Sequence, residues 1–106
     1  MIVIGRFKET HNDETYPSIF TAIRKEAHKN KEMILDYMKH GKISAVAPGY
    51  LQDVIDDNTR INNLTCYTDG TYTWRSDVIY YFDKYNIALP NDFIDHVLRT
   101  IRSSRE

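Results

Sequence analysis

The clearest pattern of apolar and polar positions lies in the second half of the chain. Two short segments rich in Thr, Tyr and Trp, at 64–67 and 71–74, flank the pair Asp69-Gly70. Residues of these types suit a half-buried pleated surface, and an Asp-Gly pair favours a tight turn with positive φ at both central residues. We therefore predict a β-hairpin whose alternate aromatic residues share one face.

Helical spacing follows the predicted hairpin twice. Ser76 can cap a first helix, and apolar residues then recur three and four positions apart as far as Tyr85. Pro90 and Asn91 suit the start of a second helix. We therefore predict helices over 76–85 and 90–101. The predicted buried positions are Val78, Ile79, Phe82 and Tyr85 in the first helix, and Phe93, Ile94, Val97, Leu98 and Ile101 in the second.

The first half of the chain gives weaker patterns. Pro17 and Ser18 suit the start of a helix, and apolar residues at helical spacing continue towards Gly41, which stands where a C-terminal cap is expected. We predict two helices, 17–29 and 31–40, although one kinked helix would fit the same residues. The other expectations are a short strand or ordered tail at 1–7, a loop at 8–15, a short apolar segment at 42–47, one or two helical turns within 50–55 and a turn at 58–63.

These elements indicate an α+β fold that is mostly helical, with four to five short helices packed with one small antiparallel β-hairpin. A chain of 106 residues fits a single domain, 1–106, and it contains no internal repeat. No apolar run approaches the ~20 residues that cross a bilayer, and the N-terminal segment is too short for a secretory signal. Together with the single Cys66, this favours a cytoplasmic protein that does not contact a membrane.

Charge is spread unevenly, although the formal net charge is only −1. Aspartates concentrate between residues 52 and 95, and six of the eight tyrosines lie between residues 50 and 85. Because tyrosine is enriched at interfaces, an acidic, Tyr-rich surface could dock on a basic partner. The alternative is that the carboxylates are solvated or cap helices, while the rings belong to the core. The candidate partner-binding residues are Asp53, Asp56, Asp57, Asp69, Tyr72, Asp77 and Tyr80.

Catalytic or metal-binding chemistry has little support in the sequence. No two of the four histidines have the i, i+4 spacing of a helical zinc site, and a helix-surface hydrogen bond to Asp92 accounts for His96. Cys66 lacks a CxxC partner, and phosphate-binding glycine motifs and EF-hand spacing are missing. We therefore expect no cofactor, no metal and no enzymatic activity. The alternative of a small enzyme remains only because carboxylates that are far apart in the sequence can lie together in the folded chain.

The segment that carries the predicted hairpin and the two helices after it resembles a family pattern. It reads T-D-G-T-Y-T-W, then a helix with Y-Y, then L-P-N-D-F. This is similar to the C-terminal halves of small bacterial immunity proteins from contact-dependent growth inhibition and polymorphic-toxin systems. The resemblance covers roughly a third of the chain. The matching positions are Asp69, Gly70, Tyr72, Trp74, Tyr80, Tyr81, Leu89, Pro90 and Phe93.

The resemblance implies that the chain neutralises one cognate toxin domain, commonly a nuclease, by blocking its active site or substrate groove. It would act as a monomer in a one-to-one complex, without binding nucleic acid directly. A nuclease cleft is basic because it holds phosphates, so an acidic, aromatic inhibitor could occupy it with fast association. The mild net charge favours a localised acidic patch, or binding away from the active site. The alternative is a non-catalytic adaptor or homo-oligomer with a Tyr-rich binding face.

Overall fold

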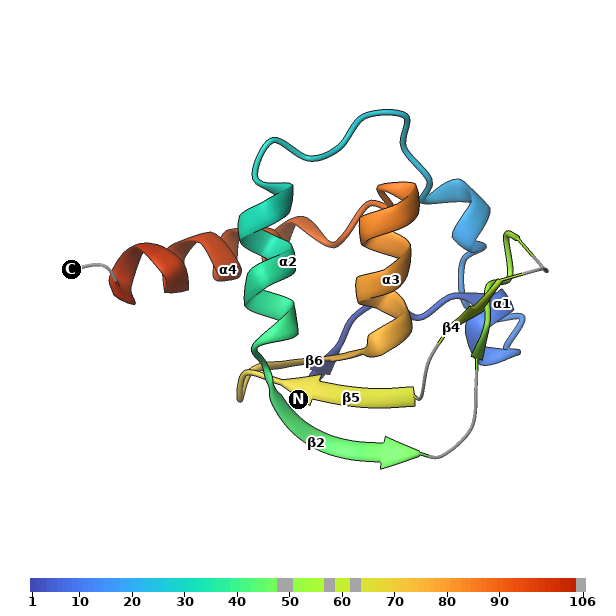
Figure 1. Cartoon of the computed structure of the whole chain (residues 1–106), viewed down its shortest axis with the longest axis horizontal. Helices are drawn as coiled ribbons and strands as arrows, with labels where there is room; N and C mark the ends of the chain where they lie inside the picture. The colour runs from blue at the N-terminus through green and yellow to red at the C-terminus, as the bar shows by residue number, and fades with distance from the viewer. Residues whose placement is uncertain (48–50, 57–58, 62–63, 105–106) are drawn as a thin grey trace.

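Three helices cover one face of a small β-sheet in the computed structural model of this chain (Figure 1). The structure describes residues 1–47, 51–56, 59–61 and 64–104. The covering helices are α2 (Lys31–Lys39), α3 (Ser76–Tyr85) and α4 (Asn91–Ser104). Two single turns, α1 (Lys8–His11) and the 3-10 helix η1 (Ile19–Thr21), lie near the N-terminus. The α+β class is confirmed, and no helix in the described ranges is long and apolar enough to cross a bilayer.

The main sheet is larger than the single hairpin that the sequence predicts. Its strand order is β1-β6-β5-β2, with β1 (Ile2–Val3) parallel to β6 (Tyr72–Arg75). The predicted hairpin is β5 (Leu64–Thr68) with β6, and β2 (Lys42–Ala47) adds an antiparallel strand on its other side. The apolar alternation of β2 is broken by a bulge at Ser44, which hides the strand in the sequence pattern.

The helical turns predicted within 50–55 are wrong where the structure describes them. Strand β3 (Leu51–Gln52) pairs antiparallel with β4 (Arg60–Ile61), which also interrupts the predicted turn at 58–63. Just after β3, Oδ1 of Asp53 accepts hydrogen bonds from the backbone N–H groups of Ile55 (2.8 Å) and Asp56 (2.9 Å). This local bonding offers the backbone an alternative to a helix and closes a turn instead.

The helix predicted over 17–29 is also wrong, and only η1 forms there. The carboxylate of Glu9 accepts from the backbone N–H of Ile19 (2.6 Å) and from the Ser18 hydroxyl (2.7 Å). The carbonyl of Ala22 accepts from the backbone N–H of Ala88 (2.7 Å). Because tertiary partners use the groups that a helix would pair internally, local propensity does not decide this segment.

The predicted elements of the second half are confirmed, as is the helix over 31–40. The hairpin turn differs in detail from the expectation. Gly70 has a positive φ of 95°, but Asp69 does not share this conformation. The side chain of Asp69 bonds to the turn backbone instead, so a turn with two left-handed residues is not needed.

Trp74 lies at the centre of the core and connects the sheet to two helices. Its indole N–H donates to the carbonyl of Met38 at the end of α2 (3.1 Å). Its ring packs on Phe93 of α4, with 5.5 Å between ring centroids. The predicted apolar stripes of α3 and α4 do face this core, although Tyr85, Leu98 and Ile101 are only partly buried.

Gly41 is required by close packing, and we expect Gly41→Ala to lower the free energy of unfolding by about 1–3 kcal/mol. A Cβ at this position would lie 2.8 Å from Cζ2 of Trp74 and 3.1 Å from Cβ of Tyr67. The C-terminal cap is His40, with a φ of −98°, and Gly41 after it does not have the positive φ that often favours glycine at a helix end. Urea-induced unfolding followed by Trp74 fluorescence measures the loss. An unchanged midpoint would show that the indole moves aside freely.

Candidate functional site

A groove of about 780 Å³ opens where the hairpin turns, between the C-terminal ends of α2 and α4. Met1, Met33 and Ile101 form part of its apolar lining. Methionine side chains are flexible and adapt to irregular partners. The groove is thus a concave, largely apolar surface that polar groups border.

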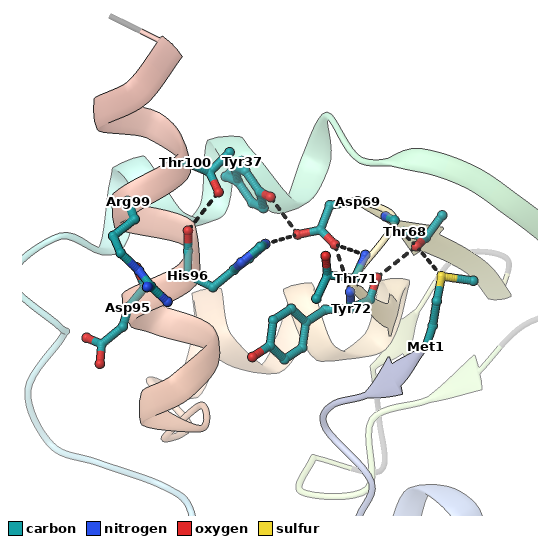
Figure 2. Close-up of polar contacts among 11 residues, drawn as sticks. Met1, Tyr37, Thr68, Asp69, Thr71, Tyr72, Asp95, His96, Arg99 and Thr100 are labelled. Carbon is teal, nitrogen blue, oxygen red and sulfur yellow. Dashed lines mark hydrogen bonds and ion pairs between the residues drawn. The ribbon is translucent and has the colours of Figure 1, made fainter. Parts of the chain in front are cut away.

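Asp69 organises the polar side of this groove. Its Oδ1 accepts from the backbone N–H groups of Thr71 (2.9 Å) and Tyr72 (2.7 Å), which closes the hairpin turn. Its Oδ2 accepts from the Tyr37 hydroxyl (2.6 Å) and lies 2.8 Å from Nε2 of His96. Figure 2 shows Tyr37 and His96 pointing at this carboxylate from two different helices. One side chain therefore connects the turn, α2 and α4.

The ionisation of Asp69 and Tyr37 follows from this arrangement. Burial opposes ionisation of Asp69, but the hydrogen bonds that it accepts outweigh burial and hold its pKa below the usual 3.8. Burial and the hydrogen bond to Asp69 both raise the pKa of the Tyr37 hydroxyl well above 10. At neutral pH the cluster therefore contains an ionised carboxylate and a neutral phenol.

A carboxylate that orients a histidine is also a common part of hydrolytic active sites. Here each Asp69 oxygen has two hydrogen-bonding neighbours, and the side chain is only 11% exposed. The Thr100 hydroxyl, one helical turn from His96, donates to the His96 carbonyl (2.8 Å). Polar groups whose hydrogen bonds are already made within the fold hold its elements together. We therefore interpret the cluster as a structural tether beside the groove.

The electrostatics of the groove combine charged side chains with helix ends. Asp36 is exposed at its rim, and Asp69 lies at its wall, whereas Lys42 supplies one opposing charge. His40 lies 3.4 Å from Asp36, one turn further along the chain. The C-terminal ends of α2 and α4 both meet the groove, and a helix C-terminus carries partial negative charge. The groove therefore favours a cationic group.

Asp53 was expected on an acidic surface, and this expectation is wrong because its side chain is fully buried. Its Oδ2 accepts from the hydroxyls of Tyr80 (2.6 Å) and Tyr85 (2.7 Å) on α3. The hydroxyl of Tyr81 accepts from the backbone N–H of Val54 (2.9 Å). These tyrosines hold the β3-β4 ribbon on α3, so they are used inside the molecule. Lys84 lies 3.7 Å from the buried carboxylate.

The ionisation of this second cluster parallels that of the first. Burial opposes ionisation of Asp53, but the hydrogen bonds from Tyr80, Tyr85 and two backbone N–H groups hold its pKa below 3.8. Burial first, and then the neighbouring carboxylate, raise the pKa of the Tyr85 hydroxyl to about 12. The two tyrosine hydroxyls thus donate hydrogen bonds to a carboxylate that stays ionised at neutral pH.

The other predicted contact residues have different environments. Tyr72 and Asp77 are buried, with 8% and 3% exposed, so an exposed role is wrong for both. Tyr80 is half-buried against Asp53, and Asp56 is half-buried with Oδ2 3.9 Å from Nζ of Lys84. Asp57 lies outside the described residues. The structure therefore does not bring the seven positions together on one surface.

Asp77 belongs to a buried ionic cluster. Burial raises its pKa, although Arg75 opposes this with an ion pair of 2.9 Å between Nη2 and Oδ2. Its Oδ1 has no hydrogen-bond partner in the described part of the chain. On the other side, Nη1 of Arg75 lies 3.3 Å from Nε2 of His11, and Nδ1 of His11 lies 2.8 Å from the Thr10 hydroxyl.

This geometry predicts that His11 makes the stability depend on pH. Burial, and then the charges of Arg75 and Arg6, lower its pKa below 6.5, while Asp77 opposes them. The native state therefore binds this proton less well than the unfolded state, and stability is lost as the pH falls below 6.5 through the native pKa. Between about pH 8 and about pH 5, thermal unfolding should shift less in His11→Gln than in the wild type. Equal shifts would contradict this role.

The sequence did not predict the groove or the residues that meet at Asp69. His96 was assigned to Asp92 on the same helix, but its ring lies against Asp69 and Tyr72 instead. Tyr37 falls within the helix predicted over 31–40, and the helical pattern does not indicate its hydrogen bond to Asp69. One feature of the sequence could have indicated this cluster. Tyrosine and histidine place polar atoms on faces that are predicted to be buried, and buried polar atoms need hydrogen-bond partners.

No group of three or more potential metal-ligating side chains occurs among the residues that the structure describes. Comparisons with protein-family models, curated proteins and solved structures gave no match to this chain.

Proposed function

We propose that this chain is an immunity-type protein that binds and neutralises one cognate toxin domain in the cytoplasm. The proposal rests on the resemblance of the segment around Asp69 and Trp74, and on one structural observation. That observation is the apolar groove at the hairpin turn, with carboxylates on its rim and wall. The chain would bind its target and perform no reaction on it.

The chemistry of the groove supports a specific kind of occupant. An arginine or lysine side chain of the toxin domain can lay its aliphatic stem on Met33 and Ile101 and direct its charge towards Asp36. The two helix C-termini add to this attraction. Nuclease clefts present such basic side chains because they bind phosphate. The same charge pattern would let the inhibitor associate quickly with its target.

The proposed contact residues differ from those that the sequence favours. Asp53, Asp77 and Tyr72 are buried and are not proposed as contacts. Asp69 contributes charge to the groove wall while its oxygens remain bonded within the fold. A rim position such as Asp36 is the better place to change binding without changing the fold, because its side chain is 77% exposed.

The test compares Asp36→Lys with Asp95→Lys, an equally drastic change at an exposed position of α4 outside the groove. Each variant is mixed with the toxin domain encoded beside this chain, and association is followed at low and high salt. We expect Asp36→Lys to slow association by roughly 5- to 10-fold at low salt, with a smaller effect at high salt.

Asp95→Lys should associate much as the wild type does. If the two variants behave alike, the groove is not the contact surface. If the wild type neither binds the toxin domain nor protects cells that express it, the immunity proposal itself is wrong.

A further inference from the structure

Among the residues that the structure describes, strand β2 forms an open edge of the main sheet. It pairs with β5 on one side, and the strand order ends with it. Five of its six residues are exposed, and Ile43 (57%) and Val46 (61%) are among the most exposed large apolar residues described. An open edge offers backbone N–H and C=O groups to another strand.

The bulge at Ser44 places the two exposed aliphatic side chains on one face. Ile43 lies opposite Tyr67, and Val46 lies opposite Thr65. Tyr67 and Thr65 are two residues apart on β5, so they point to the same face, and their partners do too. Without the bulge, residues three apart would point to opposite faces. Tyr67 also lies opposite Trp74, whose ring packs on Phe93 of α4, so the bulge directs both apolar side chains to the helix-covered side of the sheet.

We propose that β2 pairs with β2 of a second copy of this chain in an antiparallel, two-fold symmetric arrangement. With the axis between Ser44 and Ala45, Ile43 of each copy lies opposite Val46 of the other. Lys42 then lies opposite Ala47, so the two lysines stay at opposite ends of the interface. Because Ile43 and Val46 share a face, both cross-strand pairs add apolar contacts on the same side.

The pattern of β2 is complementary to a second copy of itself. A two-fold interface requires that each side chain meet a suitable partner from the same segment, and the aliphatic positions 43 and 46 satisfy this requirement. The segment contains no carboxylate and no proline, and Lys42, the residue of β2 whose charge opposes edge pairing, lies at the end of the proposed interface. A six-residue strand gives a small interface, so the dimer forms at high concentration and the predicted monomer remains the dilute state.

The first test measures the molar mass by sedimentation equilibrium from about 10 µM to about 1 mM. The wild type should show a monomer–dimer equilibrium. Val46→Lys should weaken self-association by about tenfold or more, because it places a charge beside Ile43 of the other copy. Phe20→Lys is the matched control, since it removes a similarly exposed apolar residue from η1 and should leave the dimer unchanged.

A second test examines the register. In a Cys66→Ala background, Ile43→Cys with Val46→Cys should form an intermolecular disulfide under mild oxidation, because directly opposite residues of an antiparallel pair lie close enough to bridge. Ile43→Cys alone should cross-link much more slowly.

A wild type that stays monomeric to about 1 mM overturns the proposal. A dimer that persists in Val46→Lys also overturns it. The same holds if this edge binds the toxin domain and does not bind a second copy of the chain. The dimer does not depend on the proposed immunity function, which the Asp36 variants test separately.

Discussion

Replacing Asp53 by alanine is expected to lower the free energy of unfolding by about 3–4 kcal/mol. The carboxylate is fully buried and accepts four hydrogen bonds, two from tyrosine hydroxyls and two from backbone N–H groups. Each buried donor that loses its acceptor costs about 1–3 kcal/mol, and water entry and local relaxation reduce the sum. Urea-induced unfolding measures this loss.

The control variants separate the parts of the Asp53 cluster. Asp53→Asn keeps an acceptor for the turn backbone but loses the charge, so it should cost less than alanine. Tyr85→Phe removes one donor and should cost about 1 kcal/mol. In a double-mutant cycle, Tyr85→Phe should cost less when Asp53 is already alanine. A loss of under about 1 kcal/mol for Asp53→Ala would mean that the ribbon is held by its apolar contacts instead.

The local consequence of Asp53→Ala should be visible in hydrogen exchange. The β3-β4 ribbon is joined to α3 through Asp53 and through the bond between Tyr81 and the N–H of Val54. Loss of the carboxylate should therefore expose amides of 51–56 and 59–61 before those of the main sheet.

The parts of the fold that the sequence predicts depend on residues close together in the chain. The hairpin, α3 and α4 each repeat one pattern over several residues, and α2 does the same between Lys31 and Lys39. These patterns persist because the apolar stripe of each element packs into the shared core around Trp74. Local propensity and tertiary packing agree here, so the prediction succeeds.

The failures occur where a distant partner decides the conformation. Glu9 binds the backbone at Ile19, and Ala88 binds the carbonyl of Ala22, so the segment 17–29 does not become a helix. Neither bond can be read from periodicity. The same reason explains Asp53, because its hydroxyl partners Tyr80 and Tyr85 are 27 and 32 residues away. An aspartate near tyrosines in a sequence can thus form a buried anchor as readily as an acidic surface.

The groove could not be predicted because parts of the chain that are far apart in the sequence build it. Asp36 lies on α2, Asp69 in the hairpin turn and Ile101 on α4. The sequence predicts each of these elements, but it does not show how they lie relative to one another. The sequence pattern also favours buried aspartates such as Asp53 as contact residues. Asp36, which lies on the groove rim, falls within a predicted helix and is not among the predicted contact residues.

Asp69→Ala is expected to lower the free energy of unfolding by about 3 kcal/mol, since four donors lose their acceptor at a mostly buried position. The loss has two components. The backbone bonds at Thr71 and Tyr72 stabilise the turn, whereas the bonds to Tyr37 and His96 hold α2 and α4 beside it. Chemical denaturation measures the total.

Two further variants separate these components. Tyr37→Phe should cost about 1 kcal/mol and leave the turn intact, because Oδ1 of Asp69 keeps both backbone bonds. Asp69→Asn should fall between it and alanine, because an amide oxygen can still accept from the turn. If Asp69→Ala and Asp69→Asn unfold at the same urea concentration, the turn bonds contribute little and the helices carry the effect.

Acid titration gives an independent check on Asp69. Its native pKa lies below the unfolded value of 3.8, so its contribution is fully present above pH 3.8 and is lost as the pH falls through the native pKa. Asp53 has the same sign, so each single asparagine variant should flatten the acid limb only in part, and the double variant should flatten it further. If the acid limb keeps its wild-type slope in Asp69→Asn, the carboxylate is not the anchor of the groove. The rigid wall that the proposed arginine or lysine would contact must then be held by the apolar packing of Trp74 and Phe93.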